Sequence, residues 1–342
     1  MPDRPLVSVI IVNYNGGEFL PECLEALRNQ TYDALELILV DNASEDGSAD
    51  CAEQIYGRPL TLIRNDRNEG FAGGNNQGFR AARGEWVLIL NNDAVPDPDA
   101  VANLVEFGGR HPEVGMLACR VVQYDRPHFF DSTGLLVYPD GVCRSRGWQE
   151  KDTGQYDQPQ EVLCPHGCAG MYRKTMLDDT GHFDDAYFAY LEDLDLGMRG
   201  QLRGWNCLYV PDARVRHRKS QTAGNYSKFK AYHVERNRIY NVIRLMPRFI
   251  VLVSPLFTLS RYLMQAYALA TRQGLPSDFV REYSYLGLLG VLLRAYSRAF
   301  FRLPTLLRQR RAISARRKIS TREWYDLISR FKLDAIELAL KA

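Results

Sequence analysis

The first ninety residues alternate short apolar runs with helical segments, and this alternation constrains the fold more than any other feature of the sequence. The apolar runs are VSVIIV (7–12), LELILV (35–40), LTLI (60–63) and EWVLIL (85–90). The run VSVIIV is continuous rather than alternating with polar residues, which is typical of strands buried on both faces. Repeated strand–helix–strand units predict an α/β fold with a mostly parallel central sheet and flanking helices.

Polar residues follow each of these predicted strands. They are Asn13 and Asn15, then Asp41 and Asn42, then Asn65 and Asn68, then Asn91, Asn92 and Asp93. Asn and Asp are common in turns, so a single case would mean little. In parallel sheets, however, ligands bind outside the carboxyl ends of the strands. Four polar strand ends in succession therefore predict a binding site along one edge of the sheet.

The stretch NEGFAGGNNQG, residues 68–78, is rich in glycine and leads into a helix that we expect around residues 76–82. It lacks the glycine spacing of a dinucleotide site and the lysine of a phosphate-binding loop. Glycines still allow the backbone to approach a ligand closely, and a helix N-terminus favours an anion. A loop that merely needs positive φ angles is the alternative.

Asp93, in LILNNDAVPD, is a single carboxylate at the end of a buried strand. Mg²⁺ and Mn²⁺ are commonly held by one or two carboxylates, with substrate phosphates completing the shell. Asp93 is therefore a candidate ligand for a cation bound with a nucleotide diphosphate. Such a site needs another ligand, and His217 in VRHRKS is the candidate. A structural histidine is the alternative.

The stretch FAYLEDLDLGMRGQL places three carboxylates, Glu192, Asp193 and Asp195, at a predicted helix start. Acidic residues in a first turn complement the helix dipole, which would explain one or two of them. Three of them after an aromatic segment also suit a general base in a partly desolvated pocket. The nearby CPHGC, residues 164–168, does not have the ligand spacing of a standard zinc site, and we expect a loop that lines a pocket.

The seven cysteines are odd in number and irregularly spaced. The N-terminal residues do not have the pattern of a signal peptide, so we expect free thiols in a reducing cytoplasm. No uncharged apolar run reaches the roughly 18 residues of a membrane span. The nearest approach is residues 249–260, which we expect to be broken by Pro255 and closed by Arg261.

The last third of the chain is different in character. A domain boundary is predicted near Gly224, followed by helices from Lys228 onward that prolines 247, 255, 276 and 304 divide. The segment 294–318 holds nine Arg or Lys residues and no Asp or Glu, although the whole chain has a net charge of only +2. A basic segment on an acidic body suggests an anionic partner, either a membrane or a nucleic acid. A solvated helix face is the alternative.

Six stretches occur in an order that resembles a known family. They are VSVIIVNYNGGEFLPECLEAL, VDNASEDGS, NEGFAGGNNQG, LILNNDAVPD, FAYLEDLDLGMR and VRHRKS. Together they resemble family 2 glycosyltransferases of the GT-A fold, in the bacterial rhamnosyltransferase-like branch, over about residues 5–245. The resemblance implies a catalytic domain over 1–224, with nucleotide-sugar binding in 1–110 and the acceptor and base region in 111–224. A helical region over 225–342 would follow, with a role in membrane association.

The resemblance also implies roles for individual residues. Asp41 would contact the base of the nucleotide-sugar donor, and Asp93 would be the carboxylate of the metal-binding DxD motif. The first aspartate of that motif is Asn91 here, which leaves Asn91 a contact with the donor ribose. Asp193, with Glu192 beside it, would be the catalytic base, and His217 would complete the shell of an Mg²⁺ or Mn²⁺ ion. The remaining donor-binding residues would be Asn13, Asn15, Asn42, Asn68, Gly70, Asn75 and Asn92.

The implied reaction is a single inverting displacement in cell-surface polysaccharide synthesis. The donor would be a nucleotide-diphospho-sugar, with a rhamnose type favoured over UDP-galactofuranose or a UDP-hexose. The acceptor would be a glycan or a sugar on a polyprenyl diphosphate. A non-catalytic nucleotide-sugar binding protein is the alternative from another class. A glycoside hydrolase also uses paired carboxylates but does not need the nucleotide-type loops.

The basic segment then suggests an interfacial helix on anionic lipid. Arg294, Arg298 and Arg302 recur four residues apart among apolar side chains, as in helices that lie on a membrane surface. We expect a cytoplasmic protein, peripheral on the inner face of the plasma membrane, with residues 287–293 entering the interface. Packing of these helices on the catalytic domain or on a second subunit, as in a homo-oligomer, is the alternative. Nucleic acid is not expected as a partner.

Overall fold

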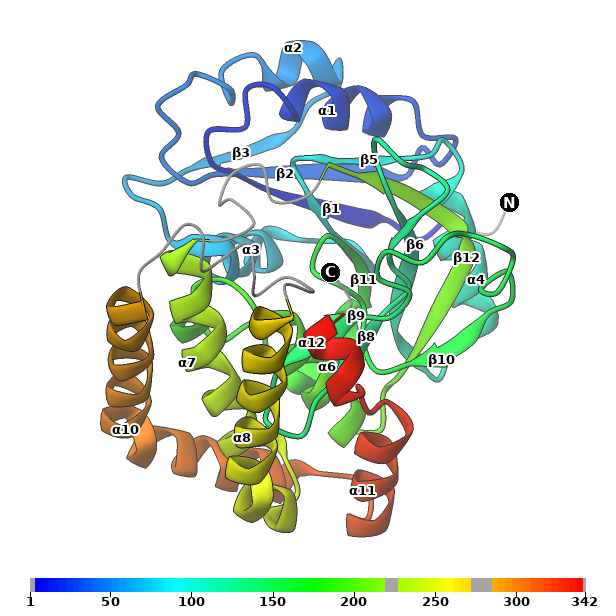
Figure 1. Ribbon diagram of the computed structural model, residues 1–342. Coiled ribbons are helices and arrows are strands. Elements are labelled where there is room, and N and C mark those ends of the chain that lie inside the picture. The colour runs from blue at the N-terminus through cyan, green and yellow to red at the C-terminus, as the bar shows by residue number, and fades with distance from the viewer. Residues whose placement is uncertain (1–3, 219–226, 272–284, 341–342) are drawn as a thin grey trace. The chain divides into compact units, whose positions relative to one another are not determined.

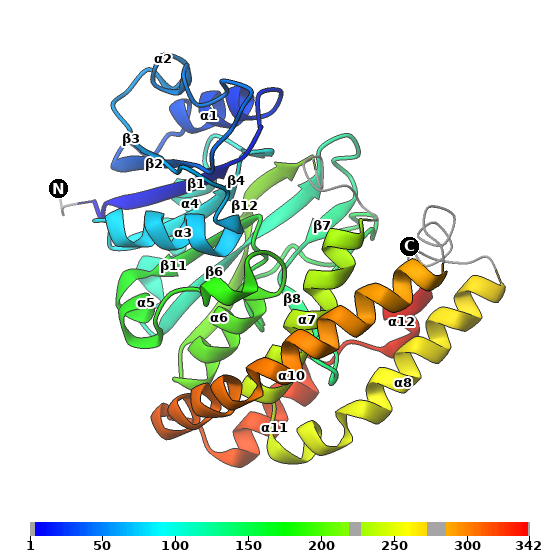
Figure 2. The same cartoon turned by 90° about the vertical axis from the view of Figure 1, so that its left-hand side faces the viewer.

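The computed structural model describes residues 4–218, 227–271 and 285–340 (Figures 1 and 2). The chain divides into two compact units. Unit 1 comprises Met1–Leu135, Ser145–Gln201 and Trp205–Thr222, and unit 2 comprises Leu136–Arg144, Leu202–Gly204 and Ala223–Ala342. The predicted boundary residue, Gly224, lies outside the described residues.

Unit 1 is built on one mixed sheet. Its strands are β1 (Val7–Asn13), β2 (Leu35–Asp41), β3 (Thr61–Arg64), β4 (Trp86–Asn91), β5 (Ala94–Pro96), β6 (Val114–Gln123), β7 (Phe130–Ser132), β10 (Gln160–Val162), β11 (Ala169–Arg173) and β12 (Asn206–His217). Their order across the sheet is β10-β12-β6-β11-β4-β1-β2-β3, with β5 on β12 and β7 on β6. β3, β2, β1 and β4 are mutually parallel, and β11 runs antiparallel between β4 and β6. The four strands predicted in the first ninety residues are confirmed.

Both faces of β1 are covered, which explains its continuous apolar sequence. Val9 and Ile11 pack into a core with helix α1 (Leu20–Arg28). Ile10 points to the opposite face, toward helix α3 (Gly70–Ala81), where a Cβ at Gly78 would lie 2.4 Å from its side chain. Figure 1 shows α1 and α2 (Ala52–Tyr56) on one side of β1 to β3 and α3 on the other. The close approach at Gly78 explains why α3 holds a glycine there, and the helix begins at Gly70, earlier than predicted.

The middle of the chain completes the sheet and its cover. Helices α4 (Ala100–Arg110), α5 (Lys174–Thr180) and α6 (Glu192–Leu202) belong to unit 1, with a short 3₁₀ turn at Asp185–Tyr187. The two segments NCLYV and ARVRH form the single strand β12. An irregularity in its pairing with β6 between Val210 and Arg214 joins them. The strand therefore spans the sheet and carries its last residue, His217, to the carboxyl edge.

Unit 2 contains a small hairpin and the C-terminal helices. The hairpin is β8 (Leu135–Val137) with β9 (Cys143–Ser145), and the helices are α7 (Lys228–Leu245), α8 (Arg248–Ala270), α10 (Tyr285–Arg316), α11 (Thr321–Arg330) and α12 (Ala335–Leu340). The helical character predicted for this region is confirmed. The prediction that prolines divide it is only partly right. Pro247 lies between α7 and α8, but Pro255 and Pro304 lie inside helices, and Pro276 is outside the described residues.

The expectation that Pro255 breaks the apolar segment is wrong, and the structure shows why. Proline has no N–H to donate to the carbonyl four residues earlier, which is that of Val251. The hydroxyl of Ser254 donates to this carbonyl instead, at 2.9 Å. Helix α8 therefore continues to Ala270. Within the described ranges it is the one helix that is long and apolar enough to cross a bilayer, judged by length and composition alone.

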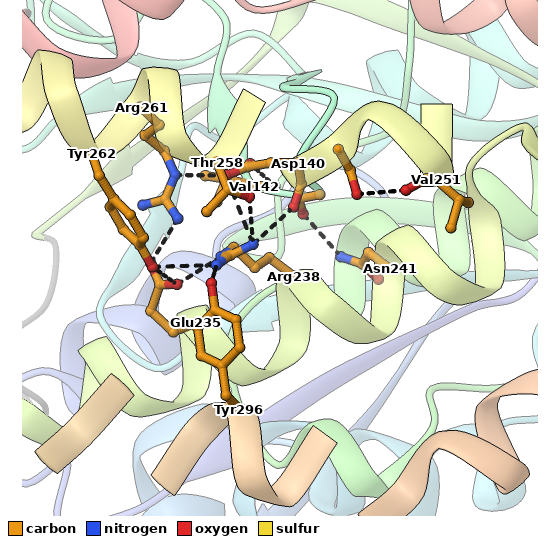
Figure 3. Close-up of polar contacts among 12 residues, drawn as sticks. Asp140, Val142, Glu235, Arg238, Asn241, Val251, Thr258, Arg261, Tyr262 and Tyr296 are labelled. Carbon is orange, nitrogen blue, oxygen red and sulfur yellow. Dashed lines mark hydrogen bonds and ion pairs between the residues drawn. The ribbon is translucent and has the colours of Figure 1, made fainter. Parts of the chain in front are cut away.

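A buried cluster of charges holds unit 2 together (Figure 3). Arg261 of α8 donates to Asp140 of the hairpin at 2.7 Å and pairs with Glu235 of α7 at 2.9 Å. Arg238 of α7 pairs with Glu235 at 2.7 Å and lies 3.8 Å from Asp140. Two arginines thus balance two carboxylates. Because a buried charge is costly unless it is paired, this arrangement fixes how the hairpin, α7 and α8 pack.

We expect Asp140→Ala to destabilise the protein by about 3–5 kcal/mol, because it leaves two buried arginines without a partner that they share. The midpoint of urea unfolding, followed by circular dichroism, measures the effect. Asp326→Asn is the matched control, because Asp326 pairs with Arg322 at 3.9 Å on the exposed surface of α11. An equal and small shift for both variants would contradict a structural role for the cluster.

Candidate active site

The structure brings the predicted polar strand ends of unit 1 to one edge of the sheet. β1 and β2 pair so that Asn13 lies opposite Asp41, and Asn91 of β4 lies opposite Val12. β12 runs parallel to β6 and ends at His217, which pairs with Ala94. Residues from opposite ends of the unit 1 sequence therefore meet at this edge because their strands end there.

Asn13 is the centre of a hydrogen-bonded network beneath this edge. Its side chain is fully buried. Its amide nitrogen donates to Asp41 Oδ1 at 3.2 Å and to Ser48 Oγ at 2.7 Å, and its oxygen accepts from Asn92 at 2.9 Å. The Ser44 hydroxyl also donates to Asp41, at 2.6 Å. Asn13 thus joins the loops that follow β1, β2 and β4, and it orients Asp41 and Asn92.

The loop after β1 closes directly over this network. A Cβ at Gly16 would lie 2.3 Å from Asn13 Oδ1 and from Asn92 Nδ2, so the close approach requires glycine. Asn15, just before it, is exposed and adopts a positive φ of 50°. Its side-chain oxygen accepts from the backbone of Glu45 at 2.8 Å. Asn15 therefore ties two loops together at the exposed rim of the edge.

A second network connects the ends of β2 and β3 to the start of α3. The amide nitrogen of Asn42 donates to the carbonyl of Gly70 at 3.0 Å, and its oxygen accepts from Asn65 at 2.8 Å. Asn68 accepts from the backbone of Gly70 at 2.8 Å. These bonds hold the glycine-rich loop against the sheet edge.

The N-terminus of α3 is already occupied in part by protein groups. The N–H of Ala72 donates to the carbonyl of Phe188 at 3.0 Å, and that of Gly70 is taken by Asn68. A Cβ at Gly70, whose φ is +75°, would lie 2.5 Å from the Phe188 oxygen. The segment before α6 therefore packs on this helix end, which leaves fewer amides for an anion than the sequence suggested.

Asn75 and its neighbour Asn76 are buried within α3. The amide of Asn75 donates to the carbonyl of Phe71 at 2.9 Å, inside its own helix. Asn76 binds the backbone of Phe183 in both directions, at 2.9 and 3.0 Å. Asn76 therefore secures the chain that leads to α6, and a donor contact by Asn75 stays a prediction.

Asp93 and His217 meet at the edge, as the sequence suggested for a pair of metal ligands. Asp93 Oδ1 lies 3.3 Å from His217 Nε2, and both side chains are buried. The other ring nitrogen, Nδ1, lies 2.7 Å from Asp131 Oδ2. Asp131 was missed in the sequence, because it lies in the short strand β7 without any motif around it. Its carboxylate fixes the His217 ring so that Nε2 points to Asp93.

The charges around His217 favour its protonated form when no cation is bound. Burial lowers the pKa of the ring, but Cys168, Asp131 and Asp93 together outweigh burial and raise this pKa well above its usual range. The two carboxylates on either side of the His217 ring concentrate negative charge at this point of the edge. The same feature favours a divalent cation.

The loop 164–168 lies between the two sets of predicted functional residues. The carbonyl of Cys168 accepts from the N–H of Asn91 at 2.9 Å. The N–H of Gly167 donates to Asp193 Oδ2 at 3.0 Å. One loop thus contacts the end of β4, two residues before Asp93, and the helix that bears Asp193, which gives CPHGC a positioning role that its sequence did not indicate.

The three carboxylates at the start of α6 have different environments. Asp195 is fully buried and pairs with Arg199 at 2.9 Å, so its role is structural. Asp193 accepts from Gly167 through one oxygen, and its other oxygen lies 2.7 Å from the N–H of Leu194. Two backbone N–H groups therefore fix the orientation of the Asp193 carboxylate.

Glu192 is more deeply isolated than Asp193. Burial, together with the charges of Asp193 and Asp195, raises the pKa of Glu192 well above its ordinary value. Within the described part of the chain, Glu192 Oε2 has no hydrogen-bond partner. A carboxyl group in this environment favours its neutral form, so Asp193 rather than Glu192 suits the role of a base.

The segment before α6 has an unusual backbone. Phe188, Tyr190 and Leu191 have positive φ angles of 64°, 70° and 68°. Non-glycine residues rarely adopt this region, and such strain gathers at functional sites. Here the strained segment leads directly into Glu192 and Asp193.

Comparison with known proteins identifies the family of this chain. The family model for glycosyl transferase family 2 matches residues 8–181, which is half of the chain. The chain belongs to this family. It is 28% identical over 261 residues to the N-acetylglucosaminyl-diphospho-decaprenol L-rhamnosyltransferase of Mycobacterium tuberculosis, covering 67% of this chain and 81% of that protein. The protein is therefore a family 2 glycosyltransferase.

Solved structures of glycosyltransferases have the same fold. The structure of GalNAc-T7 with UDP, GalNAc and Mn²⁺ gives a TM-score of 0.61 at 14% identity, over 83% of this chain and 57% of that chain. The mannosyltransferase PcManGT of Pyrobaculum calidifontis, in complex with GDP-Man and Mn²⁺, gives 0.50 at 20% identity, over 99% and 86%. The expected GT-A fold is confirmed, with a central sheet, flanking helices and C-terminal helices.

We expect Glu192→Gln to gain stability over the wild type as the pH rises. The pKa of Glu192 is higher in the folded than in the unfolded state, so the folded state holds this proton more tightly. Wild-type stability therefore falls as the pH rises from the unfolded pKa toward the folded pKa, and the glutamine variant escapes this loss.

Urea unfolding at a series of pH values measures the difference between the two proteins. Below the unfolded pKa of the glutamate the gain should be absent. Glu106→Gln, on the exposed surface of α4, is the matched control. A difference between Glu192→Gln and wild type that stays constant with pH would contradict the prediction.

Proposed function

We propose that this glycosyltransferase is an inverting enzyme that transfers a rhamnose-type sugar from a nucleotide-diphospho-sugar. The acceptor would be a glycan or a sugar on a polyprenyl diphosphate, in cell-surface polysaccharide synthesis. The observation that carries the proposal is the contact of one loop, 164–168, with both Asn91, two residues before Asp93, and the predicted base Asp193. The name of the mycobacterial relative supports a rhamnosyl donor and a lipid-linked acceptor.

The residues at the edge fit a divalent cation, Mg²⁺ or Mn²⁺, that is carried by the donor. Asp93 and His217 offer one oxygen and one nitrogen side by side. Within the described ranges no group of three or more His, Cys, Asp and Glu forms a metal cage. Two protein ligands with diphosphate oxygens and water are what such an ion commonly takes, and the similar GT-A structures were obtained with Mn²⁺. When bound, the ion would stabilise the departing nucleoside diphosphate as a Lewis acid.

Asn91 departs from the family motif, and its surroundings suggest a different role. Its amide nitrogen lies 3.5 Å from His217 Nε2, and its side chain is half-buried. A neutral amide is a weaker cation ligand than a carboxylate, so we assign Asn91 to the donor ribose. Asp41, held by Asn13 and Ser44, is assigned to the base of the nucleotide.

In the proposed mechanism Asp193 takes the proton of an acceptor hydroxyl. The hydroxyl oxygen attacks the anomeric carbon of the donor while the bond from that carbon to the diphosphate oxygen breaks. Nucleoside diphosphate leaves, and the configuration at the anomeric carbon inverts. The backbone N–H of Gly167 and that of Leu194 hold the carboxylate in place for this transfer.

The C-terminal helical region, predicted over 225–342, is proposed to bring the enzyme to the inner face of the plasma membrane. A polyprenyl-linked acceptor lies in a bilayer, so a peripheral position would place the enzyme near its substrate. The arginine-rich helix α10 supplies the positive charge that anionic lipid attracts. A homo-oligomer formed by the same helices is the competing proposal.

Calorimetric titration with dTDP and with UDP, each with and without Mn²⁺, tests donor and cation binding together. We expect binding to at least one nucleotide, strengthened by Mn²⁺. Asp93→Ala should abolish the strengthening, because it removes the one carboxylate assigned to the ion. Asp131→Asn should weaken the Mn²⁺-dependent binding by about 10- to 100-fold, because it releases the His217 ring.

Preference for dTDP would support the rhamnose-type donor, and preference for UDP would support UDP-galactofuranose or a UDP-hexose. Asp99→Asn, on the exposed loop before α4, is a matched control that should bind as wild type does. If neither nucleotide binds even with Mn²⁺, the proposal fails and Asn91 marks a site that has lost its function.

Asp193→Asn should lower kcat by roughly 10²- to 10⁴-fold, because it removes the general base. Its affinity for the nucleotide should stay near that of wild type, since Asp193 is assigned to the acceptor. Turnover assays with the preferred donor, together with the titration above, measure both quantities. A variant that loses nucleotide affinity and kcat together would place Asp193 in the donor site instead.

A further inference from the structure

Helix α8 of unit 2 is polar on its buried side and apolar on its exposed side. Ser254 and Arg261 are buried, and Thr258 and Tyr262 are half-buried and bond to Arg238 (Figure 3). The exposed large side chains recur every three or four residues, which places them along one face. They are Phe249, Leu252, Leu256, Leu259, Leu263 and Tyr267. This polarity is the reverse of that of an ordinary surface helix.

The exposed face of α8 also lacks charge. From residue 249 to residue 268 the only charged residue is Arg261, which is 4% exposed and engaged by Asp140 and Glu235. With a rise of about 1.5 Å per residue, the uncharged face extends over roughly 30 Å. Leu252 is 76% exposed on it. Apolar patches of this extent mark interaction sites in soluble proteins.

The neighbouring helix α10 indicates what covers this face. Tyr262 of α8 and Tyr296 of α10 both accept hydrogen bonds from Arg238 of α7, so the two helices lie next to the same part of α7 (Figure 3). α10 has no Asp or Glu from Tyr285 to Arg316. It presents further exposed apolar residues and a set of exposed arginines: Leu289, Leu293, Phe300, Phe301, Arg294, Arg298, Arg308, Arg311 and Arg316.

Charge complementarity separates a lipid surface from a second copy of the chain. Two copies that met through these helices would bring their arginine sets together without acidic partners on α10. Anionic lipid headgroups would instead neutralise the arginines while the apolar side chains enter the acyl region. The combination of an uncharged apolar face on α8 with exposed arginines on the neighbouring helix α10 therefore favours a membrane.

The buried charges determine the orientation of α8 on that membrane. Arg261, at the middle of α8, is fixed to Asp140 of the hairpin and to Glu235 of α7. If α8 crossed the bilayer, it would draw these paired charges and the helix that bears them into the hydrocarbon, at high cost. A helix that lies in the plane of the interface keeps the cluster on the protein side.

We propose that the exposed face of α8, from Phe249 to Tyr267, lies in the plane of an anionic bilayer and enters it. The inference deepens the membrane contact proposed above and rests on it. The inference also changes which helix is expected to enter the membrane. The sequence suggested residues 287–293 and the arginines of α10, whereas the exposed apolar face in the structure belongs to α8. Of the arginines that recur four residues apart, Arg302 is half-buried and lies over the ring of Tyr240 of α7.

Flotation of the full chain with vesicles of phosphatidylcholine and phosphatidylglycerol tests the proposal. The variant Leu252→Glu with Leu259→Glu places two charges on the α8 face, and we expect its lipid partition coefficient to fall at least about tenfold. Thr321→Glu with Ser329→Glu adds the same charge to exposed positions of α11 and is the matched control. It should partition as wild type does. Equal binding of the wild type and the α8 variant would overturn the proposal.

A second measurement does not depend on disturbing the face. Leu256→Trp should add a tryptophan signal that shifts to the blue when anionic vesicles are present, and Ser329→Trp should add one that does not. Sedimentation without lipid tests the other occupant. The proposal would be overturned if the wild type were a dimer, the α8 variant were a monomer, and neither protein bound vesicles. That result would assign the face to a second copy of the chain.

Nucleotide titration of the same α8 variant separates this inference from the proposed activity. The α8 face belongs to unit 2 and the nucleotide-binding residues belong to unit 1, so the variant should bind dTDP or UDP as wild type does. If the wild type binds nucleotide but does not bind vesicles, only the membrane inference is refuted. If the wild type binds vesicles but binds neither nucleotide, only the donor proposal is refuted.

Discussion

The parallel pairing of β1 with β2 and β4 is the constraint on which the site depends. It sets Asn13 opposite Asp41 and brings Asn91 to the same edge. Because these strands are buried on both faces, their polar groups can gather only where the strands end. The side-chain amide of Asn13 bonds to the loops that follow β2 and β4. The position of Asp41 therefore depends on the register of the strands as well as on the sequence of its loop.

Buried charge serves two different purposes in this protein. In unit 2, Arg238 and Arg261 are matched by Asp140 and Glu235, and the neutral cluster specifies how the surrounding segments pack. At the sheet edge of unit 1, His217 lies between Asp93 and Asp131, and even a positively charged His217 ring offsets only one of these two carboxylates. The first arrangement is complete without a ligand, whereas the second is suited to receive a cation. This difference in charge balance distinguishes a structural cluster from a candidate site.

Helix α8 shows how a polar interior can determine an apolar exterior. Its four inward polar side chains are committed to Arg238, Asp140, Glu235 or the freed carbonyl of Val251. Many of the remaining side chains of this 23-residue, mostly apolar helix are therefore left on its outward side, among them Leu252, Leu256 and Leu263. A composition that would suit a buried helix in another protein is therefore displayed on the surface here, and a hydrophobic surface of this kind calls for an apolar environment.

The sequence by itself determined the strands of the sheet, the polar residues at their ends, and Asp93, Asp193 and His217 as the residues of interest. Periodicity and strand-end chemistry are local properties, so they can be read along the chain. Only the tertiary structure decided that Asp131 orients His217, that the backbone N–H groups of Gly167 and Leu194 contact Asp193, that Glu192 is buried beside two other carboxylates, and that Pro255 lies within a helix. Most of these depend on contacts between segments that are distant in sequence. The continuation of α8 through Pro255 depends on the Ser254 hydroxyl, which donates to the carbonyl that proline leaves without a partner. The exposure of the apolar face of α8 is likewise a tertiary property, because composition does not reveal which side of a helix is buried.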